Sequence, residues 1–144
     1  MIRLICVGKM KDRRLADLTA DFTRRIKGLA PFQILEIRDS RPEQEGRDLL
    51  QRLASQAGNS VMVAWDERGE AISSRGLADL LSRHGSLAFL IGGADGLDAA
   101  VRQRAHLMLR LSQLTLTHEM ARVLVIEQIY RGLCILRNMP YHRD

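Results

Sequence analysis

Cysteine is scarce in this sequence, which contains only Cys6 and Cys134, each within an apolar run. Two widely separated residues supply neither the disulfide framework of a small secreted domain nor the ligand set of a zinc site. We therefore expect two buried free thiols and a protein of the reducing cytoplasm.

Long apolar stretches are also missing. No run approaches the roughly 18 residues of a membrane-spanning helix, and the amino terminus lacks the apolar segment of a secretory signal. The chain has 144 residues, of which 46% are hydrophobic and 27% charged, and this composition is typical of soluble globular proteins. Because there is no linker or internal repeat, residues 1–144 are predicted to form one soluble domain.

Several catalytic signatures are absent. The sequence has no Gly-x-Gly-x-x-Gly, no Gly-Lys-Ser/Thr and no Gly-x-Ser-x-Gly, which argues against pyrophosphate or triphosphate ligands and against a serine nucleophile. The histidines lack metal-ligand spacing, so no metal is expected. His84 and His106 are interpreted as structural or solvated, whereas His118 lies at a better position, where a hydroxyl-rich segment meets the last helix.

Lysine is rare, yet the net charge is +5 because arginine is abundant. An excess of positive charge favours a polyanionic partner such as RNA or DNA. A GC-rich genome would explain the arginine bias but not the net charge. The polar face of the first helix carries Arg13, Arg14, Arg24 and Arg25, which are either simply solvated or contact an anion.

The remaining pattern alternates strands and helices. Strands are predicted at 2–7, 32–37, 60–65, 87–91 and 106–111, and helices at 11–27, 49–57, 73–85, from 98, and 119–138. Residues 38–46 are predicted to be a mobile loop and 66–70 a turn. This order predicts an α/β fold, a mostly parallel sheet flanked by helices.

The most informative segment is Leu87–Leu97, an apolar run that leads directly into Gly92, Gly93 and Gly96. Such a run indicates a strand buried on both faces. A glycine loop at the carboxyl end of a buried strand is where open α/β sheets bind small molecules. On this evidence alone a plain tight turn is as good an interpretation as a ligand cradle.

The last helix is apolar around nearly its whole circumference. A single buried face cannot accommodate so many apolar residues, so the helix must be covered on two sides. A second copy of the chain, packed about a two-fold axis, is one candidate for the second surface.

Four ordered motifs resemble one family: 90–97, 111–118, 122–131 and 140–143, with Leu4–Lys9 in agreement at the amino end. The family is ribosomal RNA large subunit methyltransferase H, a group of small SPOUT methyltransferases, and the similarity extends over essentially the whole chain. It implies methylation of N3 of a pseudouridine in 23S ribosomal RNA with S-adenosylmethionine as the cofactor. It also implies a SPOUT fold with a C-terminal trefoil knot, and a homodimer built around the knot.

The resemblance further implies a cofactor pocket made by the ends of three strands. Its residues are Trp65, Gly92, Gly93, Leu111, Ser112, Gln113, Leu114, Thr115 and Leu116. The chain departs from the family at two positions: Thr117 replaces a usual proline, which would make that loop less rigid, and Trp65 replaces an aliphatic residue. Trp65 either stacks on adenine or fills the wall.

The catalytic candidates lie near the carboxyl terminus. His142 is proposed as a base or an RNA contact, Arg143 and Arg131 as groups that hold phosphate or the imide oxygens, and Tyr141 as a stacking residue. A frayed terminus is the alternative for the tail, and an ordinary helix pair with Glu127 is the alternative for Arg131. In a dimer, the tail of one chain could complete the pocket of the other.

Two rival functions stay open. One is a non-catalytic nucleotide- or RNA-binding module of the same fold, and the other is a methyltransferase for a different RNA position. Because so small a chain has no separate RNA-binding domain, we expect it to act as a homodimer on a preassembled target, the ribosome or its large subunit.

Overall fold

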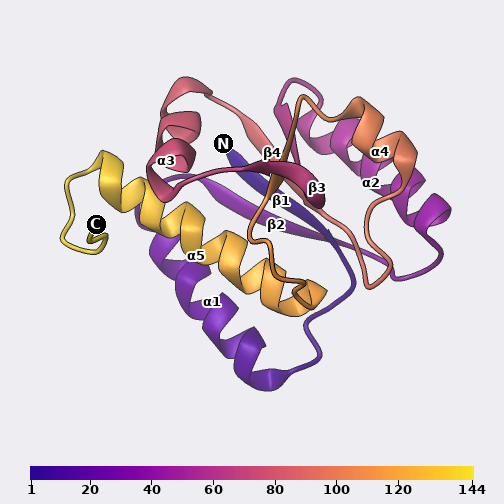
Figure 1. Ribbon diagram of the computed structural model, residues 1–144, viewed down its shortest axis with the longest axis horizontal. Coiled ribbons are helices and arrows are strands. Elements are labelled where there is room, and N and C mark those ends of the chain that lie inside the picture. The colour runs from indigo at the N-terminus through magenta and orange to yellow at the C-terminus, as the bar shows by residue number, and fades with distance from the viewer.

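A computed structural model describes all residues, 1–144 (Figure 1). The elements are, in chain order, β1 (Ile2–Val7), α1 (Arg13–Lys27), β2 (Phe32–Ile37), α2 (Pro42–Ala57), β3 (Val61–Ala71), α3 (Ser74–Arg83), β4 (Leu87–Ile91), α4 (Ala99–Arg104), β5 (Leu107–Arg110) and α5 (His118–Leu136). The five strands form one parallel sheet in the order β2-β1-β4-β3-β5. The predicted α/β class is therefore confirmed.

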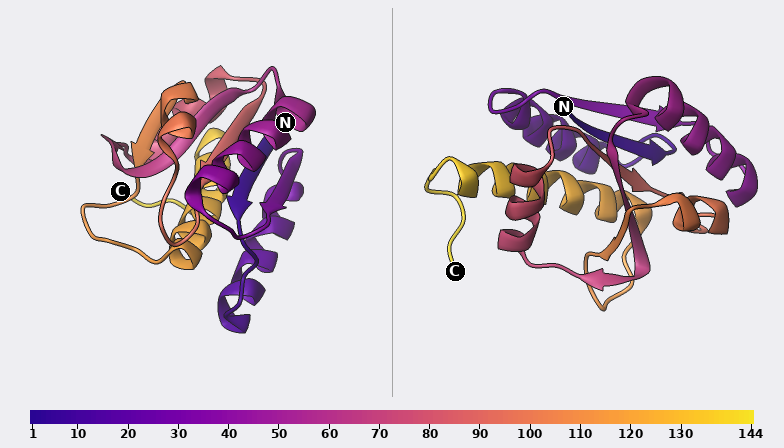
Figure 2. Two further views of the ribbon diagram at one scale, coloured as in Figure 1. Left: turned by 90° about the vertical axis from the view of Figure 1, so that its right-hand side faces the viewer. Right: turned by 90° about the horizontal axis from the view of Figure 1, so that it is seen from above.

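Helices cover both faces of the sheet, as the views in Figures 1 and 2 show. One core lies between the sheet and α1, α3 and α5, and the other between the sheet and α2 and α4. Every residue of β4 is buried, as the continuous apolar run predicted. The helices that follow β3 and β4 lie on opposite faces, so the loops that leave these neighbouring strands diverge at the carboxyl edge of the sheet.

Side-chain caps explain where several helices begin. Asp12, Ser73, Asp98 and Thr117 each precede a helix and accept a hydrogen bond from a backbone N–H of its first turn. Such caps satisfy donors that have no partner within the helix. For Thr117, the Oγ1–Met120 N distance is 3.3 Å, so the residue that replaces proline here stabilises the start of α5.

The predicted mobile loop at 38–46 was wrong in its second half. Helix α2 begins at Pro42, and Glu45 and Gly46 are buried within it. Proline suits the first turn of a helix, where its missing N–H costs nothing and its fixed φ is already helical. The polar composition of this segment reflects an exposed first turn that carries Glu43.

The predicted turn at 66–70 was also wrong. Strand β3 continues to Ala71, although its register with β5 shifts between Trp65 and Glu70, which both pair with Leu109. Gly69 permits this arrangement, because a Cβ there would lie 2.5 Å from the backbone carbon of Leu109. A close backbone approach within a strand is a recognised use of glycine.

Helix α5 is enclosed by its own chain: it packs on β4 and lies between α1 and α3. The expected burial on two sides is thus present in one chain, without a second copy. Its exposed apolar residues are Met120 and Leu136, at 40% and 41%.

A buried arginine anchors the first turns of α5. Arg122 is 2% exposed and donates to the carbonyl oxygens of Val7 and Gly8, at 3.0 and 2.6 Å, and to Glu36 Oε2 at 2.8 Å. These bonds fix the amino end of α5 beside the carboxyl ends of β1 and β2.

Both cysteines are free and buried, as predicted. Burial raises the pKa of the Cys6 thiol to about 12, so it stays protonated and unreactive. None of the helices is both long and apolar enough to span a membrane.

Candidate functional site

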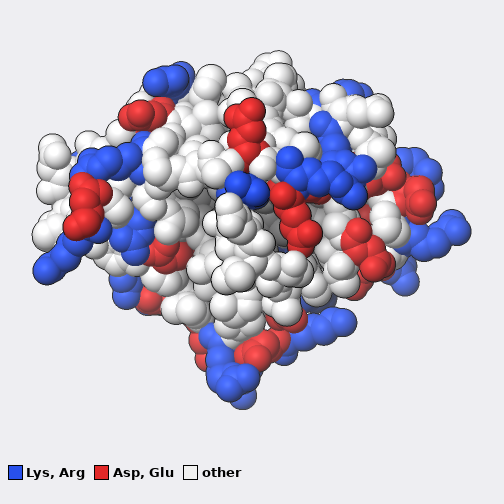
Figure 3. Space-filling model, in the orientation of Figure 1, with Lys and Arg blue, Asp and Glu red and all other residues white.

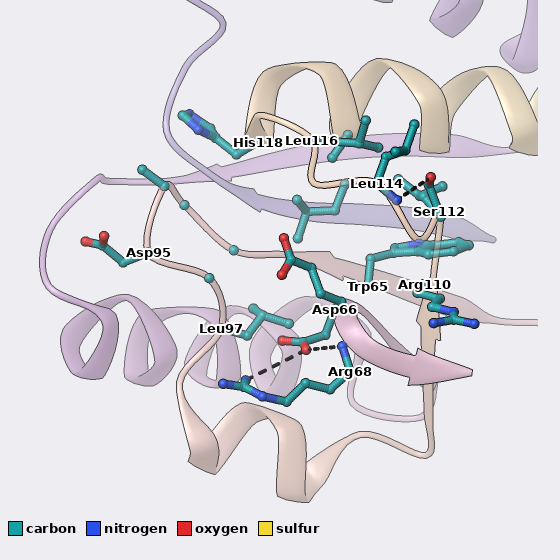
Figure 4. Close-up of a pocket in the computed structure, with 18 residues that line it drawn as sticks. Trp65, Asp66, Arg68, Asp95, Leu97, Arg110, Ser112, Leu114, Leu116 and His118 are labelled. Carbon is teal, nitrogen blue, oxygen red and sulfur yellow. Dashed lines mark hydrogen bonds and ion pairs between the residues drawn. The ribbon is translucent and has the colours of Figure 1, made fainter. Parts of the chain in front are cut away.

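A pocket of about 380 Å³ opens between the middle of β3 and the loops after β4 and β5 (Figure 4). This volume is within the range of small-molecule and cofactor sites. Its lining comes from β3, the end of β4 with the glycine loop, the end of β5 with the segment that follows it, and the start of α5. The lining residues are Trp65, Asp66, Glu67, Arg68, Ile91, Gly92, Gly93, Ala94, Asp95, Gly96, Leu97, Arg110, Leu111, Ser112, Leu114, Leu116, His118 and Ala121.

The glycine loop closes on itself. The N–H of Gly96 donates to the carbonyl of Gly93 at 3.0 Å, and Gly96 has a φ of +80°. A Cβ on Gly92 would lie 2.6 Å from the carbonyl carbon and oxygen of Gly96. Glycine at these positions is therefore a steric requirement, which leaves a wall of exposed backbone facing the pocket.

The segment after β5 forms a structured loop, as its hydroxyl content predicted. The Ser112 hydroxyl accepts a hydrogen bond from the backbone N–H of Leu114 at 2.9 Å, a local turn of the kind that serine favours. Of the six predicted pocket residues here, Leu111, Ser112, Leu114 and Leu116 line the pocket. Gln113 and Thr115 are exposed and lie outside the lining.

Trp65 forms a rigid wall at the base of the pocket. It is 7% exposed, and its ring stacks on Phe89 with a centroid distance of 6.2 Å. Its indole Nε1 is buried and has no hydrogen-bond partner within the chain. A smaller cavity of about 190 Å³ shares Trp65, Arg110 and Leu111 with the first pocket.

The rim of the pocket carries both signs of charge. Asp66 Oδ1 accepts from the backbone N–H of Arg68 at 2.9 Å and lies 3.8 Å from its guanidinium, while Arg110 forms no ion pair or hydrogen bond through its side chain. In Figure 3, blue and red atoms are interspersed across this face. The excess positive charge is therefore not gathered here into one basic patch.

The tail residues form a separate cluster at the other end of α5. Glu127 Oε1 accepts from Arg131 Nη2 at 2.6 Å and from the Tyr141 hydroxyl at 2.8 Å. The Tyr141 ring also lies edge-on to Tyr130, with centroids 4.7 Å apart. Burial, followed by the hydrogen bond to Glu127, raises the pKa of Tyr141 to about 12, so it remains a donor.

Hydrogen bonds also define the protonation of His142. Its Nδ1 lies 3.2 Å from Arg131 Nη1 and its Nε2 lies 2.8 Å from Asp144 Oδ1. Because a guanidinium can only donate, Nδ1 is the acceptor and Nε2 carries the proton. The Asp144 carboxylate also pairs with Arg75 of α3. The tail is thus docked on its own chain, and His142 could act as a base only after its contact with Arg131 opens.

The structure therefore divides the predicted site residues into two groups. Trp65, the glycines and most of the 111–116 segment meet around one pocket. Arg131, Tyr141 and His142 meet at the carboxyl end of α5, and Arg143 is exposed beside them. Along a helix axis, the 13 residues from His118 to Arg131 correspond to roughly 20 Å. None of these four residues lines the pocket, although Gln128, whose amide donates to Glu127, lines the smaller cavity that shares Trp65, Arg110 and Leu111 with it.

Sequence reasoning missed several pocket residues. Asp66, Glu67 and Arg68 were placed in a turn, and Asp95 and Arg110 were not singled out, yet all five line the pocket. The available signal was position, since Asp66–Arg68 come directly after the buried part of β3, Asp95 follows β4 and Arg110 ends β5. His118, noted for its location, lines the pocket as well.

A parallel α/β sheet with a glycine-walled pocket at its carboxyl edge, closed by the segment before the last helix, defines a class of nucleotide- or cofactor-binding proteins. The sequence matches the family model described as predicted SPOUT methyltransferase over residues 1–142. The chain belongs to the SPOUT methyltransferase family.

Two relatives are similar over almost their whole length. The ribosomal RNA large subunit methyltransferase H of Syntrophotalea carbinolica is 41% identical, with 98% of this chain and 97% of the relative covered. The protein of the same name from Desulfovibrio desulfuricans is 44% identical, with 98% and 96% covered.

Solved structures share the fold at low identity. The tRNA (m1G37) methyltransferase of Aquifex aeolicus has a TM-score of 0.64 at 13% identity, covering 99% of this chain and 76% of that one. A putative RNA methyltransferase of Bacillus anthracis has a TM-score of 0.61 at 12% identity, covering 99% and 100%. The predicted SPOUT fold is confirmed by this similarity and the family match.

Proposed function

We propose that this chain is an S-adenosylmethionine-dependent methyltransferase that methylates N3 of a pseudouridine in 23S ribosomal RNA. One observation carries the proposal: the pocket at the carboxyl edge unites Trp65, the glycine loop and the 111–116 segment, the three segments that the family resemblance assigns to the cofactor. The names of the relatives support ribosomal RNA as the substrate.

The pocket has the features that this cofactor requires. The backbone of Gly92 and Gly93 forms part of the pocket wall, the Trp65 ring adds a flat apolar surface, and the 111–116 backbone offers donors and acceptors to an adenine edge. When bound, S-adenosylmethionine supplies a methyl group on a positively charged sulfur. The residues of the chain position this donor against the acceptor nitrogen.

The acceptor imide must lose its N3 proton, and charge then develops on the ring oxygens. Arg131 and Arg143 are suited to hold those oxygens or a nearby phosphate, and Tyr141 to stack on a base. His142 is the base once its bond from Arg131 opens, as binding of a polyanion to that arginine would promote. Its accepting nitrogen then becomes free to take the proton.

A homodimer would bring the two groups of residues together. The tail residues meet around Glu127 and Arg131, outside the pocket lining of their own chain, whereas an isologous interface places the same elements of two chains against each other. Exposed apolar side chains are available for such an interface on α5 and the preceding loop, including Leu114 at 75% exposure. The trefoil knot that the resemblance implies stays a prediction.

Calorimetry with S-adenosylmethionine tests the cofactor assignment. Saturable binding is expected, and no heat at millimolar cofactor would leave the non-catalytic binding module as the better account. Mass spectrometry of ribosomal RNA from a deletion strain tests the target, since a 23S pseudouridine should lose its methyl group. If the methylation of this pseudouridine were unchanged in the deletion strain, the enzyme would have to methylate another RNA position.

Methylation assays on two substrates test the expected partner. Assembled ribosomes or large subunits should be modified, whereas an isolated stem-loop at physiological salt should not, and efficient turnover on the stem-loop would contradict this. Mixed dimers of a tail-deleted chain and a pocket-dead chain test assembly. They should regain activity if the tail acts across the interface.

A further inference from the structure

Helix α2 carries a buried carboxyl directly behind the glycine loop. Glu45 is 4% exposed, and its Oε2 atom is buried without a hydrogen-bond partner. Burying a carboxyl oxygen that has no hydrogen-bond partner costs free energy, and an apolar residue at this position would avoid that cost. Glu45 does not line the pocket itself, so any role must act through the loop in front of it.

The contacts of Glu45 and its neighbour Gly46 match the two ends of that loop. A Cβ on Gly93 would lie 2.9 Å from Glu45 Oε2 and 3.3 Å from Oε1. A Cβ on Gly46 would lie 2.9 Å from the Cβ of Asp98. Glycine inside a helix weakens it, and here it allows α2 to approach the segment that follows the loop. The Glu45–Gly46 pair therefore fits against both Gly93 and Asp98.

We propose that Glu45 is a positioning residue for the cofactor site: its side chain braces the glycine loop at Gly93 and holds the pocket wall at 92–97 in shape. The inference rests on the proposed function for the identity of the ligand, but the brace itself is a property of the chain without ligand.

The raised pKa of Glu45 indicates that the shape of its side chain, and not its charge, supports the glycine loop. Burial raises its pKa, and Asp39 and Asp95 raise it further, against the opposing backbone N–H of Ser40. The side chain therefore holds its proton to a higher pH than an ordinary glutamate. Glutamine has nearly the same shape and no charge, so Glu45→Gln should preserve the brace, whereas Glu45→Ala should remove it.

Hydrogen exchange of the cofactor-free protein tests the brace directly. Glu45→Ala should accelerate exchange of the 92–97 amides about tenfold or more, with the β5 amides unchanged. Glu45→Gln should stay within about threefold of the parent, and the exposed Glu43→Ala on the same helix should have no effect. If Glu45→Ala does not fold, Glu45→Thr removes the same carboxyl while keeping part of its volume.

Cofactor binding gives an independent readout. Glu45→Ala should weaken S-adenosylmethionine affinity about tenfold and raise the KM for the cofactor, with kcat at saturation unchanged. Gly93→Ala should also weaken binding, but less in the Glu45→Ala background, because the clashing carboxyl is gone. Gly92→Ala should not be rescued in this way, since its Cβ meets the Gly96 backbone.

Unchanged loop exchange in Glu45→Ala would overturn the proposal, as would independent effects of Gly93→Ala and Glu45→Ala. If the loop loosens as expected but the parent protein binds no S-adenosylmethionine, the brace stands and the proposed cofactor is wrong. The two ideas therefore fail separately.

Discussion

The two ends of helix α5 are built in opposite ways. Toward its amino end lies a pocket lined by the glycine loop, by charged side chains and by apolar residues such as Trp65 and Leu114. At its carboxyl end, Glu127, Arg131, Tyr141 and His142 pair with one another. A ligand site needs space and unmet hydrogen-bonding capacity, whereas a docked tail needs satisfied partners. Under the proposed function, the first end would bind the cofactor and the second would have to open before it acts.

The largest expected effect is at the amino end. Gly92→Ala should reduce S-adenosylmethionine affinity by about 100-fold or more, because its Cβ would lie 2.6 Å from the Gly96 backbone and would force the loop to move. Calorimetry measures the loss. Gly85→Ala is the matched control, since a Cβ there has nothing within 4 Å, and it should bind as the parent does. If Gly92→Ala bound the cofactor with the affinity of the parent protein, the glycine loop would not be part of the cofactor site.

The carboxyl end should separate catalysis from binding. His142→Ala should lower kcat by about 100-fold, within the usual range for a lost acid–base group, while the Kd for the cofactor stays within about twofold. Single-turnover methylation of ribosomes and calorimetry on the same preparation measure the two quantities. His84→Ala, at the end of α3, serves as the control. Loss of cofactor affinity in His142→Ala would mean that the two ends are not functionally distinct.

The hydrogen bonds that join Glu127 to Arg131 and Tyr141 should stabilise the folded protein. Glu127→Gln removes the charge that accepts from Arg131 and Tyr141, and it should lower the free energy of unfolding by about 1–2 kcal/mol. Tyr141→Phe, which removes one of those bonds, should cost about 1 kcal/mol or less. Urea unfolding followed by circular dichroism measures both. An effect of Tyr141→Phe larger than that of Glu127→Gln would contradict Glu127 as the centre of the network.

The smallest expected effect is the release of the docked tail at low pH. The Arg75 guanidinium, followed by His142, lowers the pKa of Asp144 to about 2 from an ordinary value near 4. Because the pKa of Asp144 is lowered in the docked state, its carboxylate stabilises the docked tail at a pH above the ordinary carboxyl pKa. This stabilisation is lost as the pH falls toward 2. NMR of the Tyr141 ring against pH measures tail release. Asp144→Asn should abolish this transition, and an unaltered titration in that variant would assign it to another group.

Much of the architecture was predictable because local patterns and global packing agree. The uniform apolar run of Leu87–Ile91 required burial on both faces, and the sheet places β4 between β1 and β3. Predictions failed where tertiary contacts override local composition. Asp66–Glu70 contains turn-forming residues, yet pairing with β5 keeps it extended. Pro42 was taken as part of a loop, although it begins α2.

The candidate site, like the fold, was only partly predictable from the sequence. The glycine loop and the 111–116 segment could be assigned from sequence through their resemblance to the family, and they do meet at one pocket. Glu45 could not be found in this way, because its significance lies in a contact with Gly93, far along the chain. The docking of the tail around Glu127 and Arg131, outside the pocket lining, depends on contacts that no local pattern reveals.

The sequence by itself determined the alternation of strands and helices, the buried strand β4, and the need to cover α5 on more than one side, since these depend on periodicity and apolar content. Tertiary structure decided what covers α5, which residues line the pocket, and that the tail docks on α3 and α5 of its own chain. Those outcomes depend on which distant segments meet, and the register and crossing of packed elements are fixed only when all the elements pack together.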